Sequence, residues 1–572
     1  MTCKRFQIVF VASEVSPWSY TGGLGEVLGG IPAALGKMGH RVMCISPRWD
    51  QYSDAWDTSV HFDFEIDNRI ITTRYFHTFR NNVDYVFVDH PLFLERIKGL
   101  TQMKYYGPQT GIDWPDNQIR FIVFSHAALI AILKLPLNGY PYGEECAIVC
   151  NDWHTALLPA LIAQERKKSR CLKTCIFLCI HNIVFQGRFP YESQQKMYGI
   201  DEDIFKAYVC YQSLKVGSKS PKTDIINWLK GGIYFADKVL TVSKAFAEEI
   251  VQCPSRGIEL DEDLRSKGCV GILNGLKDII SPMNLKLCKA AQIPTYNIHD
   301  VNFKKTICKS SFQAAIGITS NPTVPIFIFI GRFDVQKGCD VFFEAIRRAF
   351  GVKGANGLNS TISTGISTPE AEFEDNETTQ RNMDMQSAHI VMMGSGVQSF
   401  IQQAEELEML FPKRFKATSY VKGGLKYLAL AAADFLVAPS RFEPCGLVQM
   451  EAMRFGCLPV CTPTGGFKET VEHMRTGIHL DREIELESVV SDSSVTSLLN
   501  AMSTACSIYR DDTEKLDEMR KRAIETAHKF TLTATAIKYE QMFEECNVSD
   551  ISQYQSRETT LANIVVTDES IF

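Results

Sequence analysis

The feature that most constrains the fold is a regular alternation of short β-branched runs with amphipathic helical stretches. RFQIVFVA at residues 5–12 is followed by a helical pattern from Gly25 to Met38 and then by HRVMCISP at 40–47. The same rhythm continues with strand-like runs at 84–90, 146–152, 173–182 and 238–243. Strands that alternate with helices form βαβ units, which build a parallel sheet covered by helices on both faces. The first half of the chain is therefore predicted to be a doubly wound α/β domain.

A second series of the same kind follows an irregular stretch at 282–302. Its strand-like runs lie at 324–332, 388–396, 435–441 and 456–463. The chain has 572 residues, more than one hydrophobic core usually organises. We therefore expect two Rossmann-like domains, at 1–290 and 300–546. Residues 351–387 are rich in Gly, Ser, Thr and Asn and are expected to be a disordered insertion, and 547–572 form a polar tail.

Composition narrows the partners and the location. The chain carries 60 basic and 66 acidic side chains without a long basic patch, which argues against nucleic acid and anionic membranes as partners. The first apolar run stops at Glu14 without a cleavage site, so we expect no signal peptide, and a cytoplasmic location. The 18 cysteines form no C-x-x-C pairs. Reduced core thiols are therefore expected, in preference to a disulfide framework or a zinc site.

A glycine-rich loop, SEVSPWSYTGGLGEVLGG, follows the first expected strand. Gly22 and Gly23 let the backbone approach a ligand closely, and the helix that begins there offers free N–H groups to an anion. Such turns also occur for steric reasons alone, so the loop by itself is about equally consistent with a binding site and with a plain connection.

Two later strand ends in the same half each deliver a histidine next to a polar partner. Asp152 stands close to His154, and His181 is followed by Asn182. A single histidine of this kind is more often a satisfied core or loop residue than a catalytic one. Two at successive strand ends of one sheet favour a site that holds sugar hydroxyls, because ligands bind at the carboxyl ends of parallel strands.

The second half supplies the cations. Arg332 comes directly after an expected strand, and Lys337 follows five residues later between glycines. A guanidinium and an ammonium at a strand end suit a diphosphate leaving group, whose charge grows as the glycosidic bond breaks. The alternative is a pair of solvated surface charges, which would contribute little.

The segment APSRFEPCGLVQMEAMRFGCLPVCTPTGG is the richest in candidate residues. Glu443 lies in a turn and Glu451 eight positions later, a spacing that would put both carboxylates on one helix face, where they could bind a sugar and a ribose. Thr464, Gly465 and Gly466 form a further turn with backbone donors. No pair of aspartates lies at an expected strand end, so we expect no metal and no cofactor.

Taken together, these motifs resemble the starch synthases, in particular the granule-bound ones, within the starch and bacterial glycogen synthase family of retaining glycosyltransferases. The resemblance includes SPRWDQYSDAWDT, VFVDHPLFLE, YGPQTGIDWPDNQIRF, FADKVLTVS and GILNG, and it covers nearly the whole chain except the insertion and the tail. It implies the GT-B architecture, two Rossmann-like domains that face a deep cleft. The first domain would hold the α-1,4-glucan acceptor and the second the nucleotide-sugar.

The resemblance also implies roles for individual residues. Asp152 would lie near the reacting sugar and His181 against the donor glucose. Arg332 and Lys337 would bind the diphosphate, and Glu443 the glucose hydroxyls. The remaining donor-side residues are Gly22, Gly23, Asn274, Gly396, Cys445, Gly446, Glu451, Thr464, Gly465 and Gly466, and the acceptor-side residues are Asn151, His154, Asn182 and Gln186.

The expected reaction is the transfer of glucose, with retention of configuration, from UDP-glucose or ADP-glucose to the non-reducing 4-hydroxyl of amylose or amylopectin, with starch-granule association as a further expectation. Tyr20 stands where the family usually has a lysine. Because of this difference, a second interpretation stays open: a catalytically weakened scaffold protein that binds glucan. A phosphorylase-like enzyme would need a lysine in a pyridoxal-phosphate context, which the sequence does not offer.

Overall fold

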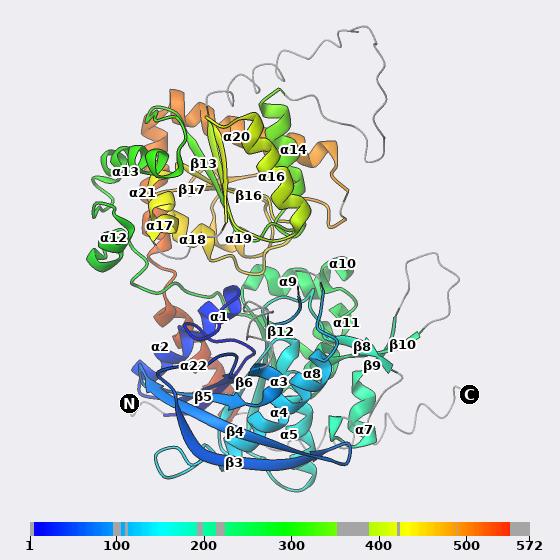
Figure 1. The fold of residues 1–572 in the computed structure, drawn as a ribbon. Helices are drawn as coiled ribbons and strands as arrows, with labels where there is room; N and C mark the ends of the chain where they lie inside the picture. The colour runs from blue at the N-terminus through cyan, green and yellow to red at the C-terminus, as the bar shows by residue number, and fades with distance from the viewer. Residues whose placement is uncertain are drawn as a thin grey trace. The chain divides into compact units, whose positions relative to one another are not determined.

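The chain divides into two compact units (Figure 1). The computed structural model describes residues 5–94, 105–108, 112–191, 198–212, 223–351, 388–419, 424–487 and 489–548. The first unit comprises Met1–Gly275 together with Leu532–Phe572, and the second comprises Leu276–Thr531. Apart from Gly351, the expected insertion at 351–387 lies outside the described residues, as does the expected tail beyond residue 548.

The first unit is built on a nine-stranded sheet in the order β12-β11-β7-β6-β1-β2-β5-β4-β3. The strands are β1 (Gln7–Val11), β2 (Arg41–Pro47), β3 (Trp56–Ile66), β4 (Arg69–Arg80), β5 (Val83–Asp89), β6 (Ala147–Asn151), β7 (Cys175–Ile180), β11 (Lys238–Thr241) and β12 (Cys269–Gly271). All neighbours from β12 to β5 are parallel, and β4 and β3 add an antiparallel edge. The chain order reverses between β1 and β6, the point where doubly wound folds bind ligands.

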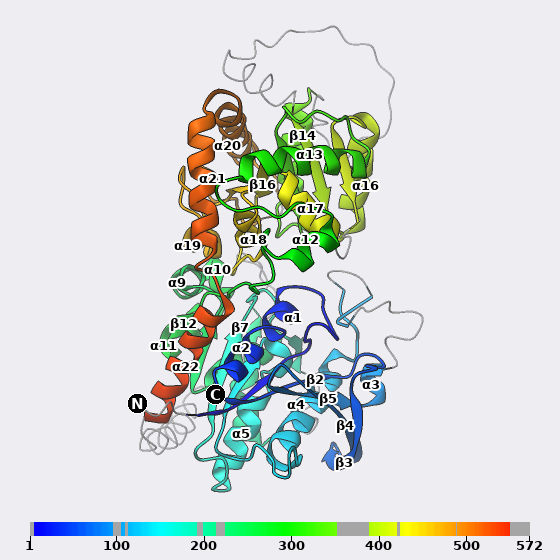
Figure 2. The same cartoon turned by 90° about the vertical axis from the view of Figure 1, so that its left-hand side faces the viewer.

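Helices cover both faces of this sheet (Figures 1 and 2). The helices of the first unit are α1 (Gly23–Leu28), α2 (Ile31–Lys37), α3 (Pro91–Leu94), α4 (Asn117–Lys134), α5 (Leu158–Lys167), α7 (Glu202–Phe205), α8 (Trp228–Phe235), α9 (Lys244–Gln252), α10 (Pro254–Gly257), α11 (Asp261–Lys267) and α22 (Leu532–Val548). A small antiparallel sheet joins β8 (Arg188–Pro190), β10 (Thr223–Asn227) and β9 (Val209–Gln212). Across the described ranges, each helix of the two units is too short or too polar to serve as a membrane-spanning segment.

The second unit has a six-stranded parallel sheet in the order β15-β14-β13-β16-β17-β18. Its strands are β13 (Ile326–Ile330), β14 (His389–Met393), β15 (Phe415–Thr418), β16 (Phe435–Ala438), β17 (Leu458–Cys461) and β18 (Ile478–His479). Its helices are α12 (Leu285–Ala291), α13 (Val301–Ile316), α14 (Cys339–Ala349), α16 (Gln398–Leu410), α17 (Gly424–Ala432), α18 (Val448–Arg454), α19 (Gly465–Thr470), α20 (Asp492–Asp511) and α21 (Thr513–Ala527). In chain order this is the Rossmann arrangement 3-2-1-4-5-6, with its reversal between β13 and β16. The prediction of two doubly wound halves is confirmed.

The last helix, α22, belongs to the first unit, which differs from the expected assignment of residues 300–546 to the second domain. It packs on α2 and β7. Two of its aromatic rings, Tyr539 and Phe543, meet Phe10 on β1 and Phe177 on β7 at centroid distances of 6.1 and 5.3 Å. The division therefore falls at Gly275/Leu276 and at Thr531/Leu532, and not near residue 290.

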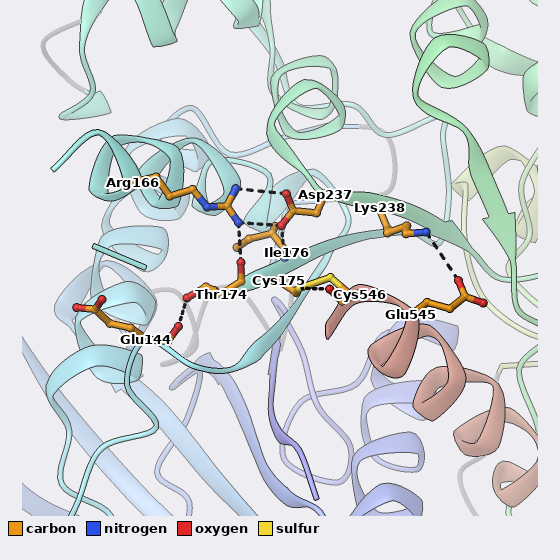
Figure 3. Close-up of a disulfide and its surroundings, with 9 residues drawn as sticks. All are labelled: Glu144, Arg166, Thr174, Cys175, Ile176, Asp237, Lys238, Glu545 and Cys546. Atoms are coloured by element: carbon orange, nitrogen blue, oxygen red, sulfur yellow. Dashed lines mark hydrogen bonds and ion pairs between the residues drawn. A yellow bond between two sulfur atoms is a disulfide. The ribbon is translucent and has the colours of Figure 1, made fainter. Parts of the chain in front are cut away.

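A disulfide fastens the end of α22 to the first residue of β7 (Figure 3). It joins Cys175 and Cys546 across 371 positions of sequence. The other cysteines of the described residues carry free thiols, most of them buried. The expectation of reduced thiols throughout is therefore wrong at this pair. The sequence could not reveal it, because Cys175 lies in a strand that reads as ordinary core and its partner comes from the far end of the chain.

Candidate active site

Polar residues gather where the chain order reverses in the first unit. β6 ends at Asn151 and is followed at once by Asp152, while Glu14 follows the neighbouring strand β1. All three side chains are buried. The carboxyl ends of two adjacent parallel strands thus place three polar side chains at one edge of the sheet, where ligands of this fold bind.

Asp152 organises the turn that follows the next strand, β7. Its Oδ1 accepts hydrogen bonds from the backbone N–H groups of His181, at 2.7 Å, and Asn182, at 3.3 Å. Its own backbone has a φ of 57°, uncommon for a residue other than glycine and a form of strain that clusters at functional sites. Burial raises the pKa of this carboxyl to about 7, although the two backbone hydrogen bonds lower it.

His181 is held by Asn151 in one tautomer. The Asn151 amide Nδ2 donates to the carbonyls of Val11 and Val149, both at 3.0 Å, so its Oδ1 is the atom that faces His181 Nε2 at 2.9 Å. Nε2 must therefore donate, which leaves Nδ1 of a neutral ring as an acceptor. Burial lowers the pKa of His181 to about 4 and keeps the ring neutral at ordinary pH.

Glu14 holds the glycine-rich loop, a role that the sequence reasoning missed. Its Oε2 accepts from the N–H of Thr21 at 2.7 Å and its Oε1 from the N–H of Gly25 at 3.3 Å. Burial raises the pKa of Glu14 to about 7. A Cβ added at Gly22 or Gly23 would meet open space. The signal for Glu14 was its position three residues after the end of a core strand, close to the position that singled out Asp152.

Other candidates on the acceptor side are used by the protein itself. His154 is buried among aromatic rings, with the rings of Trp153 and Tyr106 4.2 and 4.7 Å away, and burial lowers its pKa to about 3. Gln186 donates to the carbonyls of Ile183 and Ile258 and accepts from two other side chains. Both residues therefore support the fold of this region, whereas His181, Asn182 and Asp152 form its polar edge.

In the second unit, Arg332 and Lys337 occupy one loop between β13 and α14. Arg332 Nη2 lies 3.1 Å from Gln336 Oε1 and 3.3 Å from Asp334 Oδ2. Asp334 also accepts from the backbone N–H of Lys337 at 2.9 Å. The loop is thus braced by its own side chains, and the side chain of Arg332 stays 41% exposed.

Lys337 and Glu443 form an ion pair across the point where the chain order reverses. The Lys337 Nζ lies 2.5 Å from Glu443 Oε2, which also accepts from the Ser440 hydroxyl at 3.1 Å. Lys337 follows β13 and Glu443 follows β16, the two strands on either side of the reversal. The structure therefore brings together the two residues that the sequence placed in separate motifs.

Glycines allow the TPTGG turn to pack on the turn that carries Glu443. Gly465 has a φ of 44°, and a Cβ there would lie 2.0 Å from the Glu443 carbonyl. A Cβ at Gly466 would lie 1.9 Å from the Cys445 carbonyl, and the Gly466 N–H donates to the Glu443 carbonyl at 2.8 Å. Thr464 is buried as the residue before α19. Side chains at these glycines would displace the Glu443 backbone.

The structure shows the local environment of three further candidate residues. Gly396 lies against Phe333, where a Cβ would come within 2.2 Å of the Phe333 carbonyl, so it supports the Arg332 loop. Gly446 has a φ of 68°, a conformation that favours glycine. Asn274 belongs to the first unit, and its buried Oδ1 has no hydrogen-bond partner in the described part of the chain.

The expectation that Glu443 and Glu451 share one helix face is wrong. The helix α18 begins only at Val448, so Glu443 lies in the preceding turn, because Pro444 and the positive φ of Gly446 keep this segment from being helical. Glu451 instead pairs with Lys426 of α17, Nζ to Oε2 2.6 Å. Sequence reasoning missed Lys426, which lies 25 positions earlier in a helix with no motif of its own.

Both sheets thus present polar groups at the edges where this fold binds ligands, and the similarity to known proteins agrees with that placement. The chain is 38% identical over 513 residues to granule-bound starch synthase 1 of Solanum tuberosum, with 88% of this chain and 78% of the relative covered. The chain belongs to the starch synthase family. Granule-bound starch synthase 1 of Arabidopsis thaliana is 36% identical over 556 residues, with 96% and 83% covered.

Other comparisons agree on family and fold. Residues 7–266 match the starch synthase catalytic domain, and residues 376–501 match glycosyl transferases group 1. The catalytic domain of starch synthase IV from Arabidopsis thaliana, bound to ADP and acarbose, superposes with a TM-score of 0.74 at 23% identity, over 95% of this chain and all of that one. Sucrose-phosphate synthase from Thermosynechococcus elongatus superposes with a TM-score of 0.51 at 14% identity. The fold is GT-B, and the protein is a glucosyltransferase enzyme.

The same comparisons correct the expected location. The relatives from Solanum tuberosum, Manihot esculenta and Arabidopsis thaliana are named as chloroplastic or amyloplastic proteins. These names overturn the expectation of a cytoplasmic protein, which rested on the absence of a recognisable leader.

Proposed function

We propose that this starch synthase transfers glucose from UDP-glucose or ADP-glucose to the non-reducing 4-hydroxyl of an α-1,4-glucan, with retention of the α configuration, and associates with starch granules. The observation that carries the proposal is the Lys337–Glu443 pair at the reversal point of the second sheet. The ammonium suits a diphosphate, and the carboxylate suits the hydroxyls of the attached glucose. UDP-glucose and ADP-glucose both contain this diphosphate and this glucose.

The proposed reaction assigns a role to each of the following candidate residues. Arg332 and Lys337 stabilise the negative charge that grows on the diphosphate as the glycosidic bond breaks. Glu443 binds the glucose hydroxyls, and the neutral His181 accepts a hydrogen bond at Nδ1 from the donor glucose. Asp152 holds the His181 turn and lies near the reacting sugar.

A front-face displacement accounts for retention in the proposed reaction. The glucan 4-hydroxyl attacks the anomeric carbon from the face that the diphosphate leaves, and a departing phosphate oxygen takes the hydroxyl proton. No other proton acceptor is needed in this front-face displacement, so Asp152 acts by position and charge. The weakened-scaffold interpretation gains no support, because the family and the candidate residues both indicate an enzyme.

The test is a transfer assay with labelled UDP-glucose and, in parallel, labelled ADP-glucose, with amylopectin as acceptor. We expect label in the glucan with at least one donor, released as maltose by β-amylase, which cleaves α-1,4 bonds from non-reducing ends. Glu443→Gln should lower turnover at least tenfold, because a buried partner of the sugar is lost. Absence of transfer with both donors would reject the proposal, and binding to isolated granules tests the association separately.

A further inference from the structure

The second sheet carries another lysine–glutamate pair, formed by Lys426 and Glu451. The Lys426 Nζ lies 2.6 Å from Glu451 Oε2, and the two side chains are 16% and 7% exposed. Oε2 is buried and lacks a directed hydrogen bond, so the contact is an ion pair. Oε1 makes no hydrogen bond with any described residue. Each of the two acidic residues near the EPCG turn thus has its own ammonium group.

Topology places this second pair at the ligand edge of the sheet. In a parallel sheet, each helix that follows a strand begins at the carboxyl edge of the strands. Lys426 lies in the first turn of α17, which follows β15, and Glu451 in the first turn of α18, which follows β16. The two helices contact each other, and α17 also contacts β13. This is the edge at which Arg332 and Glu443 stand.

We propose that Lys426 is a positioning residue for nucleotide recognition: it holds the Glu451 carboxylate so that Oε1 accepts hydrogen bonds from the ribose hydroxyls of the donor. The inference rests on the proposed function. A buried carboxylate needs a counter-charge, and an ammonium bound to one oxygen fixes the direction of the other. Glu443 has a comparable arrangement, with Lys337 at one oxygen, so the two pairs divide glucose and ribose between them.

The test measures ribose discrimination directly in the full-length enzyme. Calorimetry gives the Kd of UDP and of 2′,3′-dideoxy-UDP. If ADP-glucose is the donor, ADP and 2′,3′-dideoxy-ADP are compared instead. Wild type should bind the ribonucleotide about tenfold more tightly, as expected for hydrogen bonds to a charged group. In Glu451→Gln the ratio should fall to about two, because a neutral amide accepts more weakly.

Lys426 is tested by two substitutions. Lys426→Met removes the charge at similar length and should reduce the discrimination ratio at least threefold, raise the donor KM about fivefold and change kcat less than twofold, with the glucan KM unchanged. Lys426→Arg keeps the charge and should retain at least half of the discrimination. The double variant Lys426→Met/Glu451→Gln should be no worse than Glu451→Gln alone, because both act through one carboxylate.

The outcomes separate this inference from the proposed function. A pair that serves only the fold would make Lys426→Met less stable to heat while its discrimination ratio stays at the wild-type value, and that result overturns the inference. An unchanged ratio in Glu451→Gln overturns it as well, even if Lys426→Met does not fold. Wild-type enzyme that moves no label to glucan refutes the proposed function instead, whatever the nucleotide ratios are.

Discussion

The two units present polar groups at equivalent edges of similar sheets, but with different chemistry. In the first unit, burial raises the pKa of Glu14 and Asp152 to about 7 and lowers that of His181 to about 4. Both carboxyls also accept hydrogen bonds from backbone N–H groups. In the second unit, the acidic side chains Glu443 and Glu451 are paired with lysines. One edge therefore combines a neutral imidazole with carboxyls that are about half ionised near pH 7, and the other consists of lysine–glutamate ion pairs.

This difference matches the two substrates of the proposed function. In that function both units bind polyol hydroxyls, the first through the neutral His181 and the second through the Glu443 carboxylate. A diphosphate needs cations that are already in place when charge develops, and an ion pair keeps a lysine ordered before the ligand arrives. In the proposed function, only the second edge binds the diphosphate, and this accounts for the different chemistry of the two edges.

The largest expected effect tests the charged edge. Lys337→Ala and Arg332→Ala should each lower turnover a hundredfold or more, because a donor that stabilises developing charge contributes about 3 kcal/mol to lowering the barrier. Steady-state kinetics at saturating donor and glucan measures the loss. Lys521→Ala is the matched control, since Lys521 pairs with Asp517 at 2.6 Å on α21, both side chains are partly exposed, and the variant should keep normal turnover. Near-normal turnover in both test variants would remove the contrast between the edges.

The next effect concerns stability and only the first unit. Cys175→Ser/Cys546→Ser should lower the free energy of unfolding of that unit by about 2 kcal/mol, about a thirtyfold change in its equilibrium, because the reduced chain gains freedom in the unfolded state. Thermal unfolding should show a loss of several degrees. Dithiothreitol should reproduce the shift in wild type, whereas Cys253→Ser, at a free and partly exposed thiol, should not change it. Equal unfolding of all forms would contradict the expectation.

The pH profile of turnover tests the ionisable groups at the edge of the first unit. If Asp152 acts as a carboxylate, activity rises with pH through about 7, since the folded-state pKa is raised to that value by burial. The ionised fraction then grows about tenfold between pH 6 and 8. Glu14, with its pKa also near 7, adds to the rise. His181→Asn should lower turnover but keep the midpoint, because the ring is already neutral. A flat profile would show that neither carboxylate must ionise.

The smallest effect tests the loop where the first unit lacks a cation. Tyr20 packs against Gly25, where a Cβ would lie 3.2 Å from the tyrosine ring. Tyr20→Lys should lower the donor KM about threefold and leave the glucan KM unchanged, because it returns a positive charge to a loop that the family uses near the diphosphate. Tyr20→Met serves as the uncharged control. An unchanged or higher donor KM for both nucleotides would mean that the tyrosine suits this enzyme better than lysine.

The sequence was sufficient for the doubly wound architecture and for several of the candidate residues that follow strands, although it missed the role of Glu14. Arg332, Asp152 and Glu443 were identifiable because parallel strands deliver their next residues to one edge, and periodicity located the strands. Lys426 was not identifiable, because it lies in a helix and its pairing with Glu451 depends on which helices contact each other. The disulfide and the unit to which α22 belongs depend on contacts across more than 350 positions, which no local pattern encodes.

The return of α22 to the first unit has a consequence for synthesis on the ribosome. Phe543 and Tyr539 cover rings on β1 and β7, so these core strands lack their cover until the last part of the chain has emerged. The second unit is one continuous segment, Leu276–Thr531, whose ends meet through the Leu276 N–H and the Phe530 carbonyl at 3.0 Å. It can therefore close while the first unit is still open, which reverses the usual order in which the N-terminal domain finishes first. The half of the molecule that is made first is the half that is completed last.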